Sequence, residues 1–258
     1  NVAARYFEAG KWWLNDPDAL VGNNRPVEEY RAWNTLAAMS GSVITIGDDL
    51  SMLAREKWGI LERILPAEGR VGTPVDLFQS APNNIWFLPT NLPGSKSGVL
   101  SLFNWGSKVA ITHKINLATV LNTKGKVLAY DFWNDCLLAE KNDDLEVSVP
   151  PRNVRTFCLV EAENRPQVLD VSNFLPQTGW GLDKVKWSAA TKVLQGETEG
   201  LSGKMYHIVF YSPKTYAPIE ATVNGRRILL VKQRESVWVI PITGSNHPEE
   251  WSVKFQSK

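Results

Sequence analysis

The chain has 258 residues, of which 28 are lysine or arginine, 27 are aspartate or glutamate and 43% are hydrophobic. This composition is typical of a soluble globular protein with one large domain or two to three smaller ones. The net charge of +1 excludes the strong field that recruits nucleic acid or anionic membranes, and no apolar run approaches the roughly 20 residues that span a bilayer. We therefore expect no nucleic-acid partner, no membrane and no signal peptide at the first residue, while the compartment stays open.

The chain begins with a helix-like segment, a strand-like segment and a polar loop. Residues 2–9 are compatible with a short helix, and the apolar run at 11–14 predicts a buried strand that leads into Asn-Asp-Pro-Asp at 15–18. A second helix is predicted over 27–40, because a proline precedes it, two glutamates occupy its first turn and a glycine follows it.

A second strand and helix follow. The β-branched run at 42–46 predicts a short strand that ends in Gly47, Asp48 and Asp49, and apolar residues between 53 and 65 line one face of another helix. Strands that alternate with helices are typical of parallel βα units of a TIM barrel, in which polar loops gather at the carboxyl ends of the strands. Two such units cannot close a barrel.

From about residue 83 the pattern changes to short alternating strands separated by turns. The first set is predicted at 85–88, 99–105, 108–115, 127–133, 145–149 and 154–160. A second set is predicted at 167–171, 184–187, 192–196, 205–211, 221–223, 227–232, 236–240 and 251–255, with Asn224 and Gly225 as a type I′ hairpin turn. The predicted fold class is therefore α/β plus all-β: a partial barrel at 1–80, an antiparallel β-sandwich at 81–165 and a second sandwich at 166–258, with the boundary near Arg165.

The sequence indicates no metal and no other cofactor. The three histidines are far apart with no ligand spacing, and there is no phosphate-binding glycine loop and no nucleophile elbow. Cys136 and Cys158 lie in apolar strand-like surroundings, which favours two buried thiols over one disulfide.

Several segments together resemble one enzyme family. Residues 13–20 (Trp-Leu-Asn-Asp-Pro-Asp-Ala-Leu), a helix that ends in Met-Ser-Gly at 39–41, and Ile-Gly-Asp-Asp-Leu at 46–50 have the order and spacing found in α-galactosidases of glycoside hydrolase families 27 and 36. The resemblance continues through 74–78, 130–133 and 149–152, so that it extends over roughly residues 1–160.

The resemblance implies a retaining glycosidase that acts on a carbohydrate. Such enzymes use two carboxylates about 5 to 5.5 Å apart, one as nucleophile and one as acid/base. In the family both lie on barrel strands that precede the Asn-Asp-Pro-Asp strand, and only 14 residues precede Asn15 here. The two strands of this chain then correspond to the seventh and eighth of the barrel, and the expected catalytic pair lies outside it.

Six residues are candidates for a site. Asp16 and Asp18 follow the first predicted strand, where the catalytic groups of barrel enzymes collect, so they are the catalytic candidates, although Asn-Asp-Pro-Asp also suits a simple turn. Asp48 and Asp49 follow the next strand and are candidates for substrate binding as part of a polar cluster with the first pair, with capping of the following helix as the alternative. Trp13 and Asn15 are candidates for contacts with the sugar, with core packing as the alternative for the indole.

Three functions remain open from the sequence. The first is a part of a glycoside hydrolase that obtains its other barrel strands from a complementing chain or by homo-oligomerisation. The second is a non-catalytic module whose sandwiches bind carbohydrate or brace a neighbouring domain. Exposed aromatic side chains such as Trp180 or Trp238 would favour carbohydrate binding, and buried ones would favour the structural role. The third is a diverged hydrolase that acts with its own aspartates as an oligomer of this chain.

Overall fold

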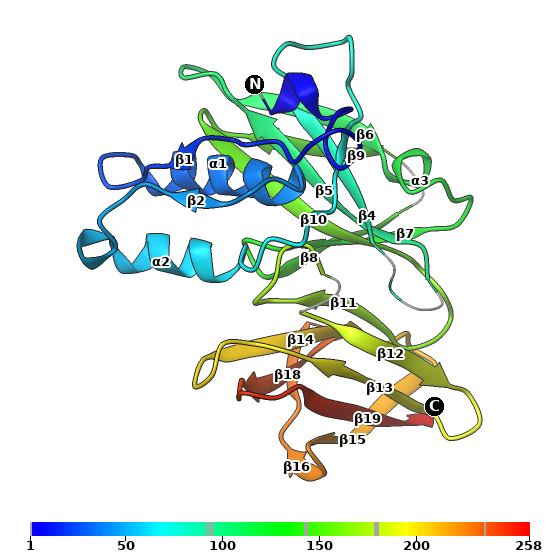
Figure 1. The fold of residues 1–258 in the computed structure, drawn as a ribbon. Coiled ribbons are helices and arrows are strands. Elements are labelled where there is room, and N and C mark those ends of the chain that lie inside the picture. The colour runs from blue at the N-terminus through cyan, green and yellow to red at the C-terminus, as the bar shows by residue number, and fades with distance from the viewer. Residues whose placement is uncertain (1, 91, 93–94, 142–143, 178–180, 235) are drawn as a thin grey trace.

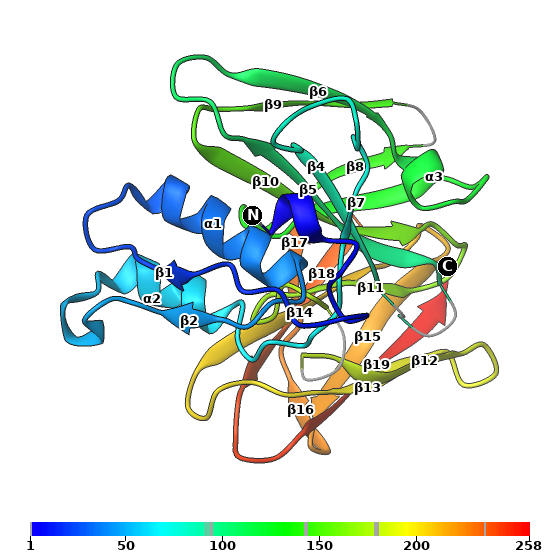
Figure 2. The ribbon, with the colours of Figure 1, turned by 45° about the horizontal axis from the view of Figure 1, so that its top comes forward.

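The computed structural model of the chain describes residues 2–90, 92, 95–141, 144–177, 181–234 and 236–258. They form a small α/β part and two successive groups of antiparallel sheets. Figure 1 shows the α/β part beside the first group of sheets, with the second group packed at one end of both. Figure 2 gives the same arrangement from another side. No described helix combines the length and the apolar character needed to cross a membrane.

The α/β part contains one parallel strand pair. β1 (Ala19–Leu20) pairs with β2 (Thr45–Ile46), α1 (Val27–Met39) connects them, and α2 (Arg55–Glu62) follows. Helix α1 begins and ends as predicted, because acidic side chains stabilise its N-terminal end and the glycine after Ser40 adopts a φ of +63°. The described residues thus contain one parallel β-α-β unit and a further helix, but no barrel.

Two predictions in the first fifteen residues are wrong. The helix predicted at 2–9 is only a single 3-10 turn, η1 (Ala3–Arg5). The strand predicted at 11–14 does not form: Trp12 is 76% exposed, and Trp13 has only an isolated bridge to Ala9. An apolar run becomes a strand only when a neighbouring strand accepts its backbone hydrogen bonds, and in the described chain the partner of β2 is the segment that follows the Asn-Asp-Pro-Asp loop.

The first group of sheets is built on six strands in the order β3-β4-β5-β10-β7-β8. Its strands are β3 (Thr73–Pro74), β4 (Ile85–Thr90), β5 (Ser97–Asn104), β7 (Val127–Asp131), β8 (Cys136–Lys141) and β10 (Asn153–Glu161). A second layer consists of β6 (Ile111–Asn116), the short helix α3 (Leu117–Val120) and β9 (Asp144–Val149). All eight residues of β5 are buried, because this layer covers one face of the sheet and helix α1 lies against the other.

The second group is a sandwich of two sheets, β11-β14-β18-β17 and β12-β13-β19-β15-β16. The bounds are β11 (Gln167–Val171), β12 (Asp183–Ser188), β13 (Val193–Thr198), β14 (Met205–Tyr211), β15 (Tyr216–Val223), β16 (Arg226–Ile228), β17 (Val231–Arg234), β18 (Val237–Thr243) and β19 (Glu249–Ser257). Asn224 and Gly225 both have positive φ and connect β15 to β16, as the hairpin signal predicted. The single strand predicted at 227–232 is instead two, because the chain passes there from one sheet to the other.

One hydrophobic core connects all three parts. A single cluster of buried side chains includes Leu20 from β1, Trp86 from β4, Phe210 from β14 and Phe255 from β19. Both cysteines are free thiols, Cys158 buried and Cys136 half-buried. The sandwiches therefore pack against the α/β part through apolar contacts.

Candidate functional site

The Asn-Asp-Pro-Asp loop lies between two hollows of the surface. The larger hollow, of about 500 Å³, is bounded by Asp16 and Asp18 on one side and by Trp33 of α1 and Trp105 on the other. The smaller, of about 260 Å³, is bounded by Trp13, Asn15 and Asp16. Most of the lining of the larger hollow is apolar, and the two aspartates are among the residues that line it. This combination can hold a ligand that has both a hydrophobic face and hydroxyl groups.

Each carboxylate of the loop uses one oxygen to shape the loop itself. The backbone N–H of Asp18 donates to Oδ1 of Asp16 over 2.8 Å, and that of Ala19 donates to Oδ1 of Asp18 over 2.7 Å. Asp18 has a φ of +69°, a left-handed conformation that aspartate tolerates better than most residues. The second oxygen of each carboxylate accepts no hydrogen bond from the described residues. The Asn-Asp-Pro-Asp segment therefore forms the turn that was the alternative interpretation of its sequence. The remaining oxygen of each carboxylate can still bind a further group.

Asn15 and Trp13 hold the loop in place. Asn15 is buried; its amide donates to the Arg5 carbonyl over 2.9 Å, and its carbonyl oxygen accepts from the Trp13 indole over 3.1 Å. Both polar groups of the Asn15 side chain thus form hydrogen bonds within the chain. The Trp13 ring is half exposed and packs edge-on against Trp12, which leaves part of its surface open to a ligand.

Asp48 connects the loop after β2 to the loop after β1. Its carboxylate accepts from the backbone N–H of Gly22 over 2.5 Å and from that of Asn23 over 3.0 Å. The buried ammonium of Lys57 donates to the carbonyl of Gly22, so that the same loop is held from both sides. Burial, with the Asp48 charge as a second cause, raises the pKa of the nearby Tyr30 hydroxyl to about 12. Asp48 therefore stabilises local structure.

Asp49 has the capping role that was the alternative from the sequence. Its carboxylate accepts from the backbone N–H of Ser51 over 2.9 Å and from the Ser51 hydroxyl over 2.6 Å, at the start of the 3-10 turn η2 (Leu50–Met52). These hydrogen bonds lower the pKa of Asp49. The side chain is exposed at this position.

The parallel register separates the two pairs of aspartates. Ala19 is paired with Thr45 and the backbone N–H of Val43 donates to the carbonyl of Asn15, so Asp16 and Asp18 precede β1 while Asp48 and Asp49 follow β2. Asp48 contacts the backbone of Gly22 and Asn23, beyond the C-terminal end of β1, whereas Asp16 and Asp18 lie before its first residue. The single polar cluster expected from the sequence is not formed by these strands.

The structure adds side chains to the larger hollow that the sequence did not single out. Trp33 carries the Arg25 guanidinium over its ring at 3.9 Å, and Arg25 pairs with Glu29 over 2.5 Å. Trp105 stacks on Phe103 with ring centroids 4.6 Å apart. The helical spacing of Trp33 indicated that its side chain is buried. Nothing in the sequence near Trp105 indicates that Trp105 lines the same hollow as Trp33.

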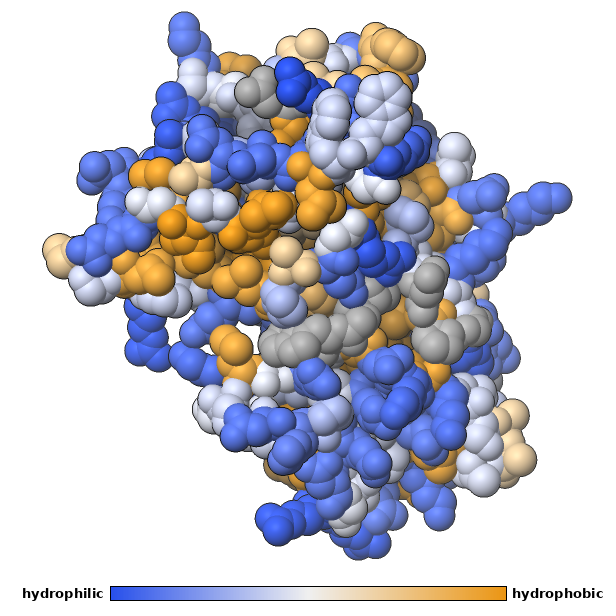
Figure 3. All heavy atoms as spheres, viewed as in Figure 1, coloured by the Kyte–Doolittle hydropathy of each residue, from blue (hydrophilic) through white to orange (hydrophobic). Residues whose placement is uncertain are grey.

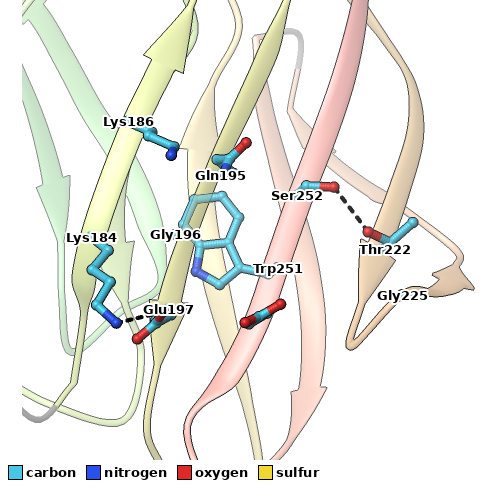
Figure 4. Close-up of a pocket in the computed structure, with 10 residues that line it drawn as sticks. Lys184, Lys186, Gln195, Gly196, Glu197, Thr222, Gly225, Trp251 and Ser252 are labelled. Atoms are coloured by element: carbon cyan, nitrogen blue, oxygen red, sulfur yellow. Dashed lines mark hydrogen bonds and ion pairs between the residues drawn. The ribbon is translucent and has the colours of Figure 1, made fainter.

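A third hollow lies on the outer face of the C-terminal sandwich. It has about 390 Å³ and is bounded by polar side chains of β12, β13, β15 and β19, which Figure 4 shows. Lys184 donates to Glu197 over 2.8 Å, and the hydroxyls of Thr222 and Ser252 are 2.9 Å apart. Trp251 in its floor is only 2% exposed, and this hollow has no open aromatic face among its lining residues. It resembles a hydrated sheet surface more closely than a sugar platform.

The aromatic residues named for a sugar-binding module give no support to that function. Trp180 lies outside the described residues. Trp238 on β18 is half-buried and carries the Lys232 ammonium 5.7 Å from its ring centroid. The described residues contain no group of three or more His, Cys, Asp or Glu side chains that could hold a metal ion.

The chain matches no protein-family model and no curated protein sequence. Among solved structures, it superposes on α-galactosidase I from Mortierella vinacea with a TM-score of 0.50 and 19% sequence identity, over 62% of this chain and 42% of that one. Over that part, the chain has the fold of the corresponding part of that α-galactosidase, and the described residues contain no barrel. The α-galactosidase-like fold inferred from the sequence motifs is therefore confirmed.

Two further structures are similar. The α-galactosidase from Saccharomyces cerevisiae gives a TM-score of 0.47 at 17% identity, over 62% of this chain and 50% of that one. A GH27 β-L-arabinopyranosidase from Geobacillus stearothermophilus gives a TM-score of 0.49 at 14% identity, over 63% of this chain and 41% of that one. The chain thus spans half or less of the length of each of these three proteins.

The structure allows a direct comparison of Asp48 with Asp49. Replacing Asp48 with alanine is expected to lower the free energy of unfolding by about 1–3 kcal/mol, because two backbone N–H groups lose their acceptor. Asp49→Ala removes an exposed cap and is expected to have a smaller effect. Urea unfolding followed by tryptophan fluorescence measures both variants. An equal decrease in the free energy of unfolding in Asp48→Ala and Asp49→Ala would show that Asp48 does not connect the two loops.

Proposed function

We propose that the chain is the C-terminal part of a retaining glycoside hydrolase that cleaves α-galactosides or related glycosides and needs further barrel strands for activity. The proposal divides the chain into the last two βα units of a barrel at 1–80, a sandwich at 81–165 and a second sandwich at 166–258. Its support is the combination of the α-galactosidase-like fold with the sequence motifs at 13–20 and 46–50.

The observation that carries the proposal is the uncovered parallel pair β1-β2. Neither strand has a second neighbour among the described residues, so each leaves backbone N–H and C=O groups on its outer edge. Figure 3 shows apolar side chains gathered on the face formed by the α/β part. Large exposed hydrophobic residues of this part include Trp12, Trp13, Leu14, Val21, Trp33 and Val43. Additional parallel strands and their helices would satisfy both the edges and the apolar face.

In this proposal the nucleophile and the acid/base lie on the added strands. The free oxygens of Asp16 and Asp18 then contact the substrate from the rim of the larger hollow, and Trp13 supplies an apolar surface beside them. Asn15, Asp48 and Asp49 support these loops through the hydrogen bonds described above. A retaining pair needs carboxyl groups about 5 to 5.5 Å apart. Asp16 and Asp18 precede β1 while Asp48 and Asp49 follow β2, so the proposal does not make these two groups the pair.

The test is hydrolysis of a panel of nitrophenyl glycosides by two proteins. The first is the 258-residue chain alone, for which we expect no rate above the uncatalysed one. The second is a chimaera in which this chain replaces the matching C-terminal part of the Mortierella vinacea enzyme, for which we expect hydrolysis of the α-galactoside. In the chimaera, Asp16→Asn and Asp18→Asn are expected to lower kcat/KM by about 10- to 100-fold, which corresponds to one or two lost hydrogen bonds to a substrate.

Light scattering of the isolated chain completes the test. Self-association that increases with concentration is expected, because the apolar face is uncovered. A stable monomer that hydrolyses a glycoside and loses that activity in Asp16→Asn would contradict the proposal and favour a hydrolase that uses its own aspartates. Activity confined to an oligomer would favour assembly of a barrel from several copies.

A further inference from the structure

The junction between the two sandwiches contains a buried carboxyl group. Strand β10 belongs to the first group of sheets and β11 to the second, and the two strands lie in contact. A register shift between Val168 and Asp170 interrupts the pairing of β11 with β14. Such a bulge changes the direction of a side chain, and the Asp170 carboxyl is directed at Cys158 of β10. An acidic side chain therefore occupies a position between two apolar layers.

The hydrogen bonds of Asp170 are incomplete. The side chain is 0% exposed, and its Oδ1 accepts from the Cys158 thiol over 3.2 Å. Its Oδ2 is buried and has no hydrogen-bond partner among the described residues. A thiol is a weak donor, so an ionised carboxylate would have little compensation here for its lost hydration.

The positive charge nearest to this carboxyl is engaged elsewhere. The Arg63 guanidinium, from the turn after α2, donates to the Phe132 carbonyl over 2.6 Å and lies 3.7 Å from Asp135. It also lies over the Phe132 ring at 4.0 Å. Arg63 forms no ion pair with Asp170 within 4 Å in the described structure, so it lowers the pKa of Asp170 only from a distance.

Besides the charged Arg63 and Asp135, three titratable groups near Asp170 have pKa values that burial shifts toward the neutral form. Burial raises the pKa of the Cys158 thiol and of the Tyr130 hydroxyl of β7, and burial lowers the pKa of His207 on β14. The side chain of Gln177 is also near Asp170, but its amide donates to the carbonyls of Val171 and Phe174. Burial raises the pKa of Asp170 itself from 3.8 to about 7. Arg63, the Cys158 thiol and the Gln177 side chain oppose this increase, and the Asp135 charge adds to it.

We propose that the sandwich junction is a pH-dependent latch, in which protonated Asp170 keeps the two sandwiches tightly packed and its ionisation loosens them. The raised pKa means that the packed state binds this proton more tightly than the unfolded chain does. The resulting stability is fully present below about pH 3.8 and is lost as the pH rises through about 7. This property is independent of the glycosidase function.

The latch can be followed by the reactivity of Cys158. Cys136 and Cys158 are the only cysteines, so in a Cys136→Ala background a disulfide reagent such as dithiobisnitrobenzoate reports on Cys158 alone. The rate of reaction in urea is divided by the rate in the folded chain at the same pH. This ratio, the protection of Cys158, is corrected for the titration of the thiol itself. This protection is expected to fall by up to about tenfold between pH 6 and pH 8, which is the change that a single group with a pKa of about 7 can produce. With Asp170→Asn added it is expected to change less than twofold, because the amide cannot ionise.

Two further measurements make the result decisive. His207→Gln is the matched control and is expected to keep the pH-dependent change, since His207 is a second side chain on β14 whose pKa burial shifts. The melting temperature of the Cys136→Ala chain is expected to fall between pH 6 and pH 8, which tests the latch even if Asp170→Asn does not fold. Protection and melting temperature that are constant over this range, or that fall equally in Asp170→Asn, would overturn the proposal.

Discussion

Replacing Arg155 with alanine is expected to lower the free energy of unfolding by about 3–5 kcal/mol, because it leaves the Asp131 carboxylate buried without its cation. Asp131 is 0% exposed. Its Oδ2 atom lies 2.6 Å from Nε and 2.5 Å from Nη2 of the Arg155 guanidinium. Only the backbone and side-chain N–H groups of Asn134, at 3.1 and 2.9 Å, would remain.

Urea unfolding at pH 7, with circular dichroism and tryptophan fluorescence recorded together, measures this loss. Lys126→Ala is the control on the same sheet, since Lys126 and Glu140 form an exposed pair over 3.5 Å. A change of at most about 1 kcal/mol is expected there. If Arg155→Ala and Lys126→Ala had the same effect, the buried pair would not contribute as inferred. Asp131 belongs to the 130–133 segment that resembles the enzyme family, and its contacts give it a structural role.

Trp86 has the second large expected effect. Its side chain is completely buried on β4 and packs edge-on against Tyr6, with ring centroids 6.2 Å apart. Trp86→Ala removes a large apolar volume from the shared core and is expected to cost about 3–5 kcal/mol. For a chain of this size the corresponding decrease in melting temperature is about 6–20 °C.

Trp86→Phe distinguishes the apolar contribution from the polar one. The Trp86 indole N–H is buried with no hydrogen-bond partner among the described residues, so phenylalanine removes an uncompensated donor together with part of the ring. We expect this variant to lose clearly less stability than Trp86→Ala in calorimetry. A loss as large as that of alanine would indicate that the indole N–H has a partner, for example an ordered water.

The sequence predicted elements whose determinants are local. The helix at 27–39 has its proline, its acidic first turn and its terminal glycine within one segment, and the structure contains it with the predicted start. Asn224 and Gly225 form the predicted hairpin because both residues tolerate positive φ. The strand β9 (Asp144–Val149) alternates exposed and buried residues, as the period of its apolar residues indicates.

The same reasoning failed where a partner strand was needed. The apolar run at 11–14 has the composition of a strand, yet β1 is formed at Ala19–Leu20, where β2 supplies the hydrogen bonds. The run at 227–232 was divided because two different sheets pair with its two halves. Hydrophobic periodicity contains no information about which segment lies alongside, so it could not place these strands.

The candidate site also combines features that the sequence predicted with features that depend on the tertiary structure. The motif at 13–20 indicated the fold and the loop that bounds the larger hollow, which are properties of order and spacing along the chain. Only the tertiary structure brought Trp33 and Trp105 to that hollow, set Asp48 apart from Asp16 and Asp18, and enclosed Asp170 between two sandwiches. The physical reason is that propensity and capping act within a few residues, whereas burial and the register of parallel strands depend on contacts between segments far apart in the sequence.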